Sequence, residues 1–269
     1  DQLGVGVGDL FAGSVVPALI LIGLYLAYVL IRAHLRPDEA PMAPRSGDVR
    51  LGRIILGIGP LLLLIFCVLG SIIFGIASPT EASGVGALGA ALLVAANGRL
   101  TLARFSRVAV LTVRNTTAVL FLAIGATCFS AVFRGVGGED MIVDWLENMD
   151  VGAWGTLIIL MIAMIVMGFF LDWLEIVLIL LPIFGPIIAA LDFGNGLSGN
   201  ALMVWFAIIV AVNLQTSFLT PPFGFSLFYM RNAAQGALTN RETYAGVMPF
   251  IGLQLLTLLI VLLWPSILI

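Results

Sequence analysis

The residues best suited to bind a ligand lie at two interruptions of long apolar runs. The first contains Asp172, a carboxylate within the apolar stretch 153–191. The second is the segment 220–224, Thr-Pro-Pro-Phe-Gly, which follows the apolar run 201–218. Each proline lacks a backbone N–H and pushes the residue before it out of the α region, so upstream carbonyls lose their helical partners. At membrane depth, such carbonyls must face protein, water or a cation.

The oxygen groups at these interruptions suit a hard monovalent cation such as Na⁺. They are carbonyls, hydroxyls and amides with at most one carboxylate, and in secondary transporters hairpin tips and broken helices meet at ion and substrate sites. A carboxylate inside an apolar run is costly and is usually functional. The residues expected to bind the cation are Gly168, Asp172, Asn213, Thr220, Pro221 and Gly224, and those expected to bind substrate are Gln215, Thr216, Ser217 and Pro222.

The segment Ser78-Pro79-Thr80-Glu81 has a structural explanation that needs no ligand. Ser78 as N-cap, Pro79 at the first helical position and Glu81 at the third would form a capping box. The sequence therefore predicts a helix that begins at Pro79.

The composition places all of these motifs in a membrane. Of 269 residues, 61% are hydrophobic and 10% are charged, with a mean hydropathy of +1.16. Soluble domains are about 25% charged, whereas a spanning helix needs about 20 apolar residues. We therefore predict an all-α polytopic membrane protein with roughly seven or eight crossings, which excludes a soluble enzyme or nucleic-acid binder. The net charge is −3 and every basic residue is Arg, so capture of a polyanion is not expected.

Arginine-rich segments mark the cytoplasmic side of the predicted topology. The acidic segment 134–150 nearly lacks Arg and is expected to be a loop outside. We predict transmembrane helices in 1–152, with cytoplasmic loops at 32–53 and 97–107. A transport-type region follows in 153–244, with a hairpin (153–191) and a broken helix (201–233). A final transmembrane helix occupies 245–269.

The stretch 153–191 can be drawn in two ways. Two full spans would put Asp172 and Glu175 at a cytoplasmic turn, whereas a re-entrant hairpin would put them at membrane depth inside protein. No Arg lies near the turn, which favours the hairpin.

Motifs in a fixed order also give the chain a family likeness. They are Gly75–Ser83 (GIASPTEAS), Gly168–Asp172 (GFFLD) followed by Leu181–Pro186 (LPIFGP), and Leu219–Gly224 (LTPPFG). In order and approximate spacing, the chain resembles the large membrane subunit of tripartite ATP-independent periplasmic (TRAP) transporters over essentially its whole length. The segment 215–225 is most similar to the branch associated with mannitol or chloroaromatic compounds.

The resemblance implies Na⁺-driven uptake of organic acids across the bacterial inner membrane. It implies two partners, a periplasmic substrate-binding protein and a small four-helix membrane subunit, and an elevator-like movement of the transport region. No cofactor is expected beyond the coupling Na⁺. Family members contain two inverted repeats, and this chain resembles only the second, with one hairpin and one broken helix. Because the first repeat is missing, the resemblance implies a C-terminal half, and the first residue, Asp1, supports the expectation of a fragment.

Three other interpretations remain open at this stage. The chain could resemble a dicarboxylate/Na⁺ symporter that works without a binding protein. Gly6, Gly8 and Asp9 match the Gly-x-Gly-Asp pattern of intramembrane aspartyl proteases, for which Asp172 would be the second carboxylate. A purely structural membrane subunit is the third, in which both breaks are kinks and the hydroxyls bond back to their own helix.

Overall fold

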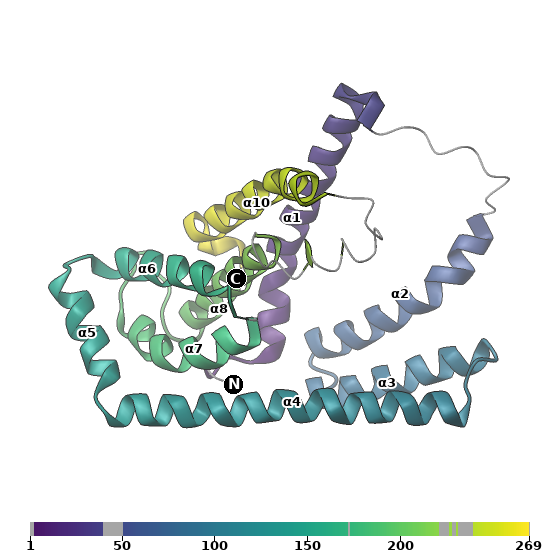
Figure 1. The fold of residues 1–269 in the computed structure, drawn as a ribbon, viewed down its shortest axis with the longest axis horizontal. Helices are drawn as coiled ribbons and strands as arrows, with labels where there is room; N and C mark the ends of the chain where they lie inside the picture. The colour runs from purple at the N-terminus through teal and green to yellow at the C-terminus, as the bar shows by residue number, and fades with distance from the viewer. Residues whose placement is uncertain are drawn as a thin grey trace. The chain divides into compact units, whose positions relative to one another are not determined.

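The computed structural model describes residues 3–39, 51–171, 173–220, 226–227, 230 and 239–268. These residues form α-helices and two short 3₁₀ helices, and they contain no β-strand (Figure 1). The elements are α1 (Val7–Leu35), η1 (Pro37–Glu39), α2 (Leu51–Ile73), α3 (Pro79–Ala96), α4 (Leu102–Gly135), α5 (Gly138–Asn148), α6 (Gly152–Met167), α7 (Trp173–Ala190), α8 (Gly199–Leu219), α10 (Asn240–Leu263) and η2 (Pro265–Ile267).

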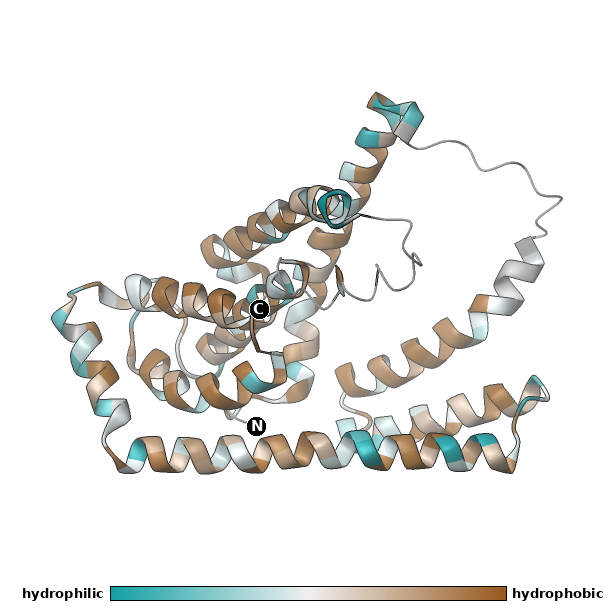
Figure 2. Ribbon diagram, in the orientation of Figure 1, coloured by the Kyte–Doolittle hydropathy of each residue, from teal (hydrophilic) through white to brown (hydrophobic). Residues whose placement is uncertain are grey.

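The helices confirm the predicted all-α polytopic membrane class. Within the described ranges, six helices are long and apolar enough to cross a bilayer, namely α1, α3, α4, α7, α8 and α10. Helix α6 is apolar but shorter. Figure 2 shows hydrophobic colour along most of the length of these helices, which is the pattern expected of surfaces that face lipid or pack on one another.

The chain divides into two packed units. The first comprises Asp1–Gly6, Gly13–Val29 and Leu120–Ile269, and the second comprises Val7–Ala12 and Leu30–Val119. Each unit is considered separately below. The first contains both of the interrupted segments singled out in the sequence, so it carries the candidate site.

The second unit is built around the packing of α2 on α3. Small residues on α3 allow close approach, since Gly86 lies against Val68 and Gly89 against Leu64. Helix α3 begins as predicted. Glu81 Oε2 accepts hydrogen bonds from Ser78 N (2.8 Å) and Ser78 Oγ (2.7 Å), and the capping box is complete. The local explanation of this motif is therefore confirmed.

Helix α8 is the centre of the first unit. It packs against α6, α7 and α10, and two-thirds of its most apolar window is buried (67%). Trp205 and Phe206 are completely buried on it. Because most of its surface is covered by protein, α8 can carry polar side chains away from lipid.

Helices α6 and α7 form a hairpin that packs on α8. The tip is the short segment between Met167 and Trp173, and the base is closed by Trp154 Nε1, which donates to the carbonyl of Phe193 at 3.0 Å. The rings of Trp154, Phe193 and Trp205 make edge-to-face contacts at this base. Helices α6 and α7 are thus consecutive helices in contact, and the transport-type hairpin with its re-entrant insertion stays a prediction.

The acidic segment 134–150 differs from the loop that we expected. Most of it forms the helix α5. Its apolar residues are spread over two sides of the helix, so the sequence contains no long apolar run that would predict a helix here.

The end of α10 is tied to α8 through a tryptophan. The residue four places after Val261 is Pro265, which has no N–H to give to the Val261 carbonyl. Trp205 Nε1 donates to that carbonyl instead, at 3.1 Å. This bond replaces a helical one in a fully buried position.

Substitution Trp205→Phe should therefore destabilise the first unit. The variant leaves the Val261 carbonyl without its donor, which costs about 1–3 kcal/mol of unfolding free energy. Thermal unfolding in detergent micelles measures the loss. Trp264→Phe is the matched control, because Trp264 is exposed (58%), and it should leave the midpoint unchanged. Equal midpoints for the two variants would contradict the role given to Trp205.

Candidate functional site

Helix α8 ends where the double proline requires it to end. Thr220 is extended (φ −86°, ψ 127°), the conformation favoured before a proline. Pro221 cannot donate to the carbonyl of Ser217, and the N–H of Thr220 bonds to that carbonyl at 3.2 Å. Thr220 Oγ1 also donates to the carbonyl of Thr216 at 2.8 Å. The C-terminal carbonyls of α8 are thus partly satisfied within its own last turn.

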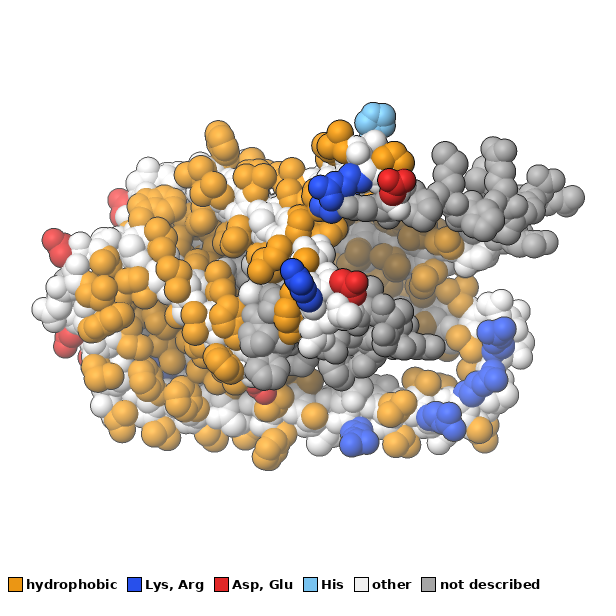
Figure 3. All heavy atoms as spheres, turned by 45° about the horizontal axis from the view of Figure 1, so that its top comes forward, with side chains coloured by type: hydrophobic (Ala, Val, Ile, Leu, Met, Phe, Trp, Pro, Cys, Tyr) orange, Lys and Arg blue, Asp and Glu red, His pale blue; other side chains and the backbone are white. Residues whose placement is uncertain are grey.

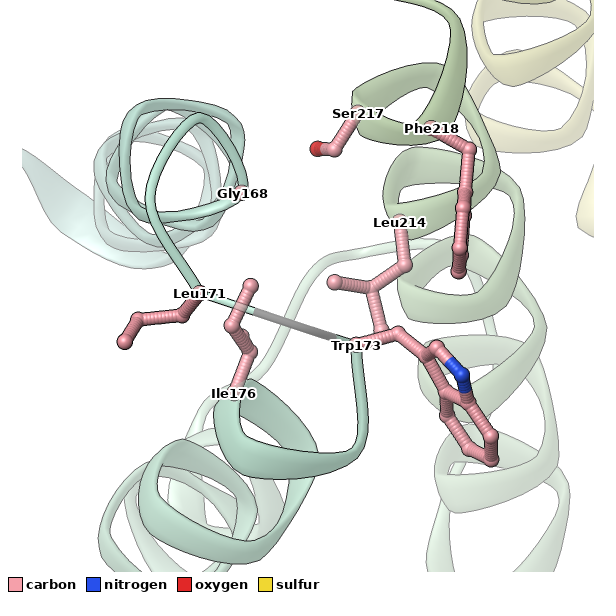
Figure 4. Close-up of a pocket in the computed structure, with 7 residues that line it drawn as sticks. All are labelled: Gly168, Leu171, Trp173, Ile176, Leu214, Ser217 and Phe218. Atoms are coloured by element: carbon pink, nitrogen blue, oxygen red, sulfur yellow. The ribbon is translucent and has the colours of Figure 1, made fainter. Parts of the chain in front are cut away.

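The hairpin tip lies against this end of α8. Gly168, the first residue after α6, approaches Ser217 so closely that a Cβ on Gly168 would overlap the Ser217 side chain. In Figure 4, the Ser217 hydroxyl points from α8 towards the Gly168 turn. The structure therefore brings together the end of α6 and the last turn of α8, which come just before the two interruptions identified in the sequence.

A small cavity lies at this meeting point. Its volume is about 10 Å³, which is close to the space that one water molecule needs. The residues lining it are Gly168, Leu171 and Trp173 of the hairpin tip, Ile176 of α7, and Leu214, Ser217 and Phe218 of α8 (Figure 4). A cavity of this size has room for a single water or a small ion, and not for an organic substrate.

Two buried oxygens on α8 lack hydrogen-bond partners among the described residues. Ser217 Oγ is one, at the cavity. The other is Asn213 Oδ1, one turn earlier on the same face, while Asn213 Nδ2 donates to the Met161 carbonyl of α6 at 3.0 Å. A buried polar atom without a partner costs about 1–3 kcal/mol, so an additional ligand at these oxygens is favoured.

The threonine hydroxyls near the end of α8 differ from the Ser217 hydroxyl, because they have hydrogen-bond partners. Thr216 Oγ1 donates to the Val212 carbonyl at 3.2 Å, and Thr220 Oγ1 donates to the Thr216 carbonyl at 2.8 Å. Both threonines therefore bond back to their own helix, as the structural-subunit interpretation expects, whereas Ser217 does not.

The cavity has few polar groups around it. No group of three or more His, Cys, Asp or Glu side chains comes together within the part of the chain that the structure describes. The side-chain oxygen that lines the cavity is the Ser217 hydroxyl, which is uncharged.

The other predicted site residues are only partly placed. Asp172, Pro221, Pro222 and Gly224 lie outside the described residues, although Leu171 and Trp173 on either side of Asp172 line the cavity. Gln215 is exposed and projects about 200° around the helix from Asn213 and Ser217, at 100° per residue. The structure therefore does not bring Gln215 together with the cavity.

One polar residue in the helical core escaped the sequence reasoning. Gln254 of α10 is completely buried, and neither of its amide atoms has a partner within the described ranges. A glutamine inside the apolar run 244–268 was the available signal, because intramembrane polar residues mark functional positions. The apolar wall of the cavity, such as Leu214, could have been found by its helical spacing from Ser217.

The comparisons with known proteins bear on the whole chain. The family described as "Tripartite ATP-independent periplasmic transporter, DctM component" matches residues 2–267. A C4-dicarboxylate TRAP transporter large permease protein DctM of Pseudomonas aeruginosa is 28% identical over 264 residues, which are 97% of this chain and 58% of the relative. The ectoine TRAP transporter large permease protein TeaC of Halomonas elongata is also 28% identical, over 98% of this chain and 59% of the relative.

A third relative is named for a different substrate. The sialic acid TRAP transporter large permease protein SiaM of Vibrio cholerae is 25% identical over 74% of this chain and 44% of its own length. The chain thus spans at most 59% of the length of these three relatives. Their names support a transport permease rather than the protease suggested by Gly6, Gly8 and Asp9. Because the family match runs through nearly all of its residues, this multi-pass membrane protein belongs to the DctM component family of TRAP transporters.

Proposed function

We propose that the chain forms part of the permease of a Na⁺-coupled uptake system for organic acids. A periplasmic binding protein would deliver the substrate, and a small four-helix membrane subunit would be the second partner. Membership in the DctM family supports this assignment. The names of the relatives cover a C4-dicarboxylate, ectoine and sialic acid, so the substrate class is that of small polar molecules that carry a carboxylate.

The observation that carries the proposal is the unpartnered Ser217 hydroxyl at the contact of hairpin tip and α8. A cation there would receive the Ser217 oxygen from one element and backbone oxygens of the Gly168 turn from the other. Asp172, next to Leu171, is our candidate for the compensating charge. Because both elements would share the ion, its binding would hold the tip against α8. Asn213 would be a further ligand or would position this face of α8.

The substrate would lie elsewhere, since the cavity is too small for it. Half-helix ends and the repeat that is present in longer relatives are the candidates for binding the carboxylate. Ser217, which the sequence grouped with the substrate residues, is thus proposed as a cation ligand instead. Gln215, Thr216 and Pro222 remain predicted substrate residues, and the exposed position of Gln215 would suit a contact made by another part of the transporter.

Removal of the Ser217 hydroxyl should weaken the response to Na⁺. In proteoliposomes that contain the full-length large subunit and its small partner, supplied with the cognate binding protein, Ser217→Ala should raise the Na⁺ concentration for half-maximal uptake by about tenfold or more, as expected for loss of a bond to a charged ligand. Asp172→Asn should have an equal or larger effect. Thr220→Ala should have a smaller one, because its hydroxyl bonds to its own helix.

Thr127→Val is the matched control, because the Thr127 hydroxyl bonds to the Ala123 carbonyl on the exposed face of α4. An unchanged Na⁺ response in Ser217→Ala and Asp172→Asn would remove these side chains from the proposed site. Uptake without any binding protein would favour the symporter alternative. Absence of uptake under all conditions would favour a structural subunit.

The contact of Gly168 with Ser217 gives a second prediction. Gly168→Ala places a methyl group on Ser217 and should lower both thermal stability and the apparent Na⁺ affinity. The double variant Gly168→Ala/Ser217→Gly makes room for the methyl group but still lacks the hydroxyl, so stability should recover while the Na⁺ response does not. Parallel recovery of both would show that packing alone matters.

Gly125→Ala on α4 controls for the change of residue type. No heavy atom of the described residues lies within 4 Å of a Cβ there. That substitution should be neutral or should stabilise the helix by about 0.5–1 kcal/mol.

A further inference from the structure

A cavity of about 430 Å³ lies within the first unit, and none of its described lining residues lines the small cavity at Ser217. Its lining includes Tyr25 of α1, Leu219 at the end of α8, and Gly246 and Phe250 of α10. The rings of Tyr25 and Phe250 meet edge to face, with their centroids 5.0 Å apart. Well-packed proteins contain few voids larger than a water molecule, whereas ligand sites have volumes of about 300–1,000 Å³. The size of this cavity is therefore that of a binding site.

The lining of the cavity changes from polar to apolar along α10. Glu242 and Thr243 come first, and both bond locally to Thr239. The Glu242 carboxylate accepts from the Thr239 hydroxyl at 2.7 Å, and the Thr243 hydroxyl donates to the Thr239 carbonyl at 3.0 Å. Val247 and Phe250 follow deeper along the helix, and apolar side chains such as these hold no ordered water. The deeper part of the cavity therefore suits an apolar ligand, or the apolar part of one.

The cavity is open to the surface of the unit. Met230 and Gly246 line it and are exposed, Met230 by 43%. Next to lining residues in the chain, Leu26 and Met248 are each 57% exposed. In Figure 3, hydrophobic side chains cover most of the described surface that is seen, with few charged groups among them. Because α1 and α10 are candidate spans, this apolar surface faces hydrocarbon, and lipid chains are the apolar molecules beside it.

Arg241 supplies a positive charge at the polar end of the cavity. It is exposed in the first turn of α10, next to Glu242. Phe250 follows it by nine residues, which is about 14 Å along a helix that rises 1.5 Å per residue. The acyl chains of one leaflet span half of the hydrocarbon core, or about 15 Å. A lipid with its phosphate at Arg241 would therefore reach Phe250 with its chain.

We propose that this cavity binds one acyl chain of a phospholipid, with the lipid phosphate at Arg241 and the chain against Val247 and Phe250. Arg-rich segments mark the cytoplasmic side, so the lipid belongs to the inner leaflet. An anionic lipid such as phosphatidylglycerol should bind best, because basic residues at the membrane surface attract anionic headgroups. The bound chain would fill the space between α1, α10 and the end of α8. This site is separate from the proposed cation site, so either proposal can fail without the other.

Photolabelling of the full-length large subunit with its small partner tests the proposal. The vesicles consist of phosphatidylcholine and phosphatidylethanolamine with rising amounts of a phosphatidylglycerol that carries a diazirine in one acyl chain, and mass spectrometry locates the label. Labelling at Tyr25 and Phe250 should saturate, as at a binding site, whereas labelling of Phe121, which is 74% exposed on α4, should rise in proportion to the probe. Proportional labelling at Tyr25 and Phe250 would overturn the proposal. Absence of label there would also overturn it, by assigning the cavity to protein.

Two pairs of variants test the chain and the headgroup separately. Gly246→Leu places a larger side chain at an open position of the cavity and should abolish the saturable labelling, whereas Gly252→Leu, at an open position of α10 that does not line the cavity, should preserve it. Arg241→Gln should weaken the binding of the probe by about fivefold, the effect of one Arg on an anionic lipid, whereas Arg114→Gln on α4 should not. Unchanged labelling in either Gly246→Leu or Arg241→Gln would overturn the proposal. The wild-type titration decides the matter if a variant fails to fold.

Discussion

Backbone carbonyls that lose their helical donor must find another, because the membrane interior offers no water. This constraint explains the tertiary contacts of the first unit. Pro265 deprives Val261 of a donor, and Trp205 of α8 supplies one. Trp154 donates to the carbonyl of Phe193, which lies in the segment between α7 and α8. The two indole bonds join α8 to α10 and close the base of the hairpin. A helix end at a proline, such as Pro265, thus becomes a site of tertiary contact.

The candidate site follows from the same constraint at the end of α8. Thr216 and Thr220 satisfy their hydroxyls within the helix, and the Thr220 N–H satisfies the Ser217 carbonyl. Ser217 could bond back as its neighbours do, but its hydroxyl points towards Gly168 and has no partner in the described chain. Only a residue without a side chain fits at position 168. The close contact leaves this oxygen unpaired, and the proposed cation would give it a partner.

Features that depend on local sequence were predictable, and those that depend on contacts between distant residues were not. The helix start at Pro79 and the helix end before Pro221 follow from capping and proline chemistry, and the structure has both. The exposed position of Gln215 also follows from helical spacing, although the prediction grouped it with Thr216 and Ser217. Helix α5 was missed because its charges mask two separate apolar sectors. The hydrogen bond from Trp205 to the Val261 carbonyl joins residues 56 positions apart, and no local sequence pattern predicts it.

The aromatic cluster at the base of the hairpin gives the protein an optical property of its own. The rings of Trp154 and Trp205 lie 6.0 Å apart at an interplanar angle of 82°. Two indoles this close and this strongly inclined couple their intense far-ultraviolet transitions, which produces a pair of bands of opposite sign in the far-ultraviolet circular dichroism spectrum. One ring belongs to α6 and the other to α8, so the amplitude of that pair reports directly on the attachment of the hairpin to the helix that it accompanies.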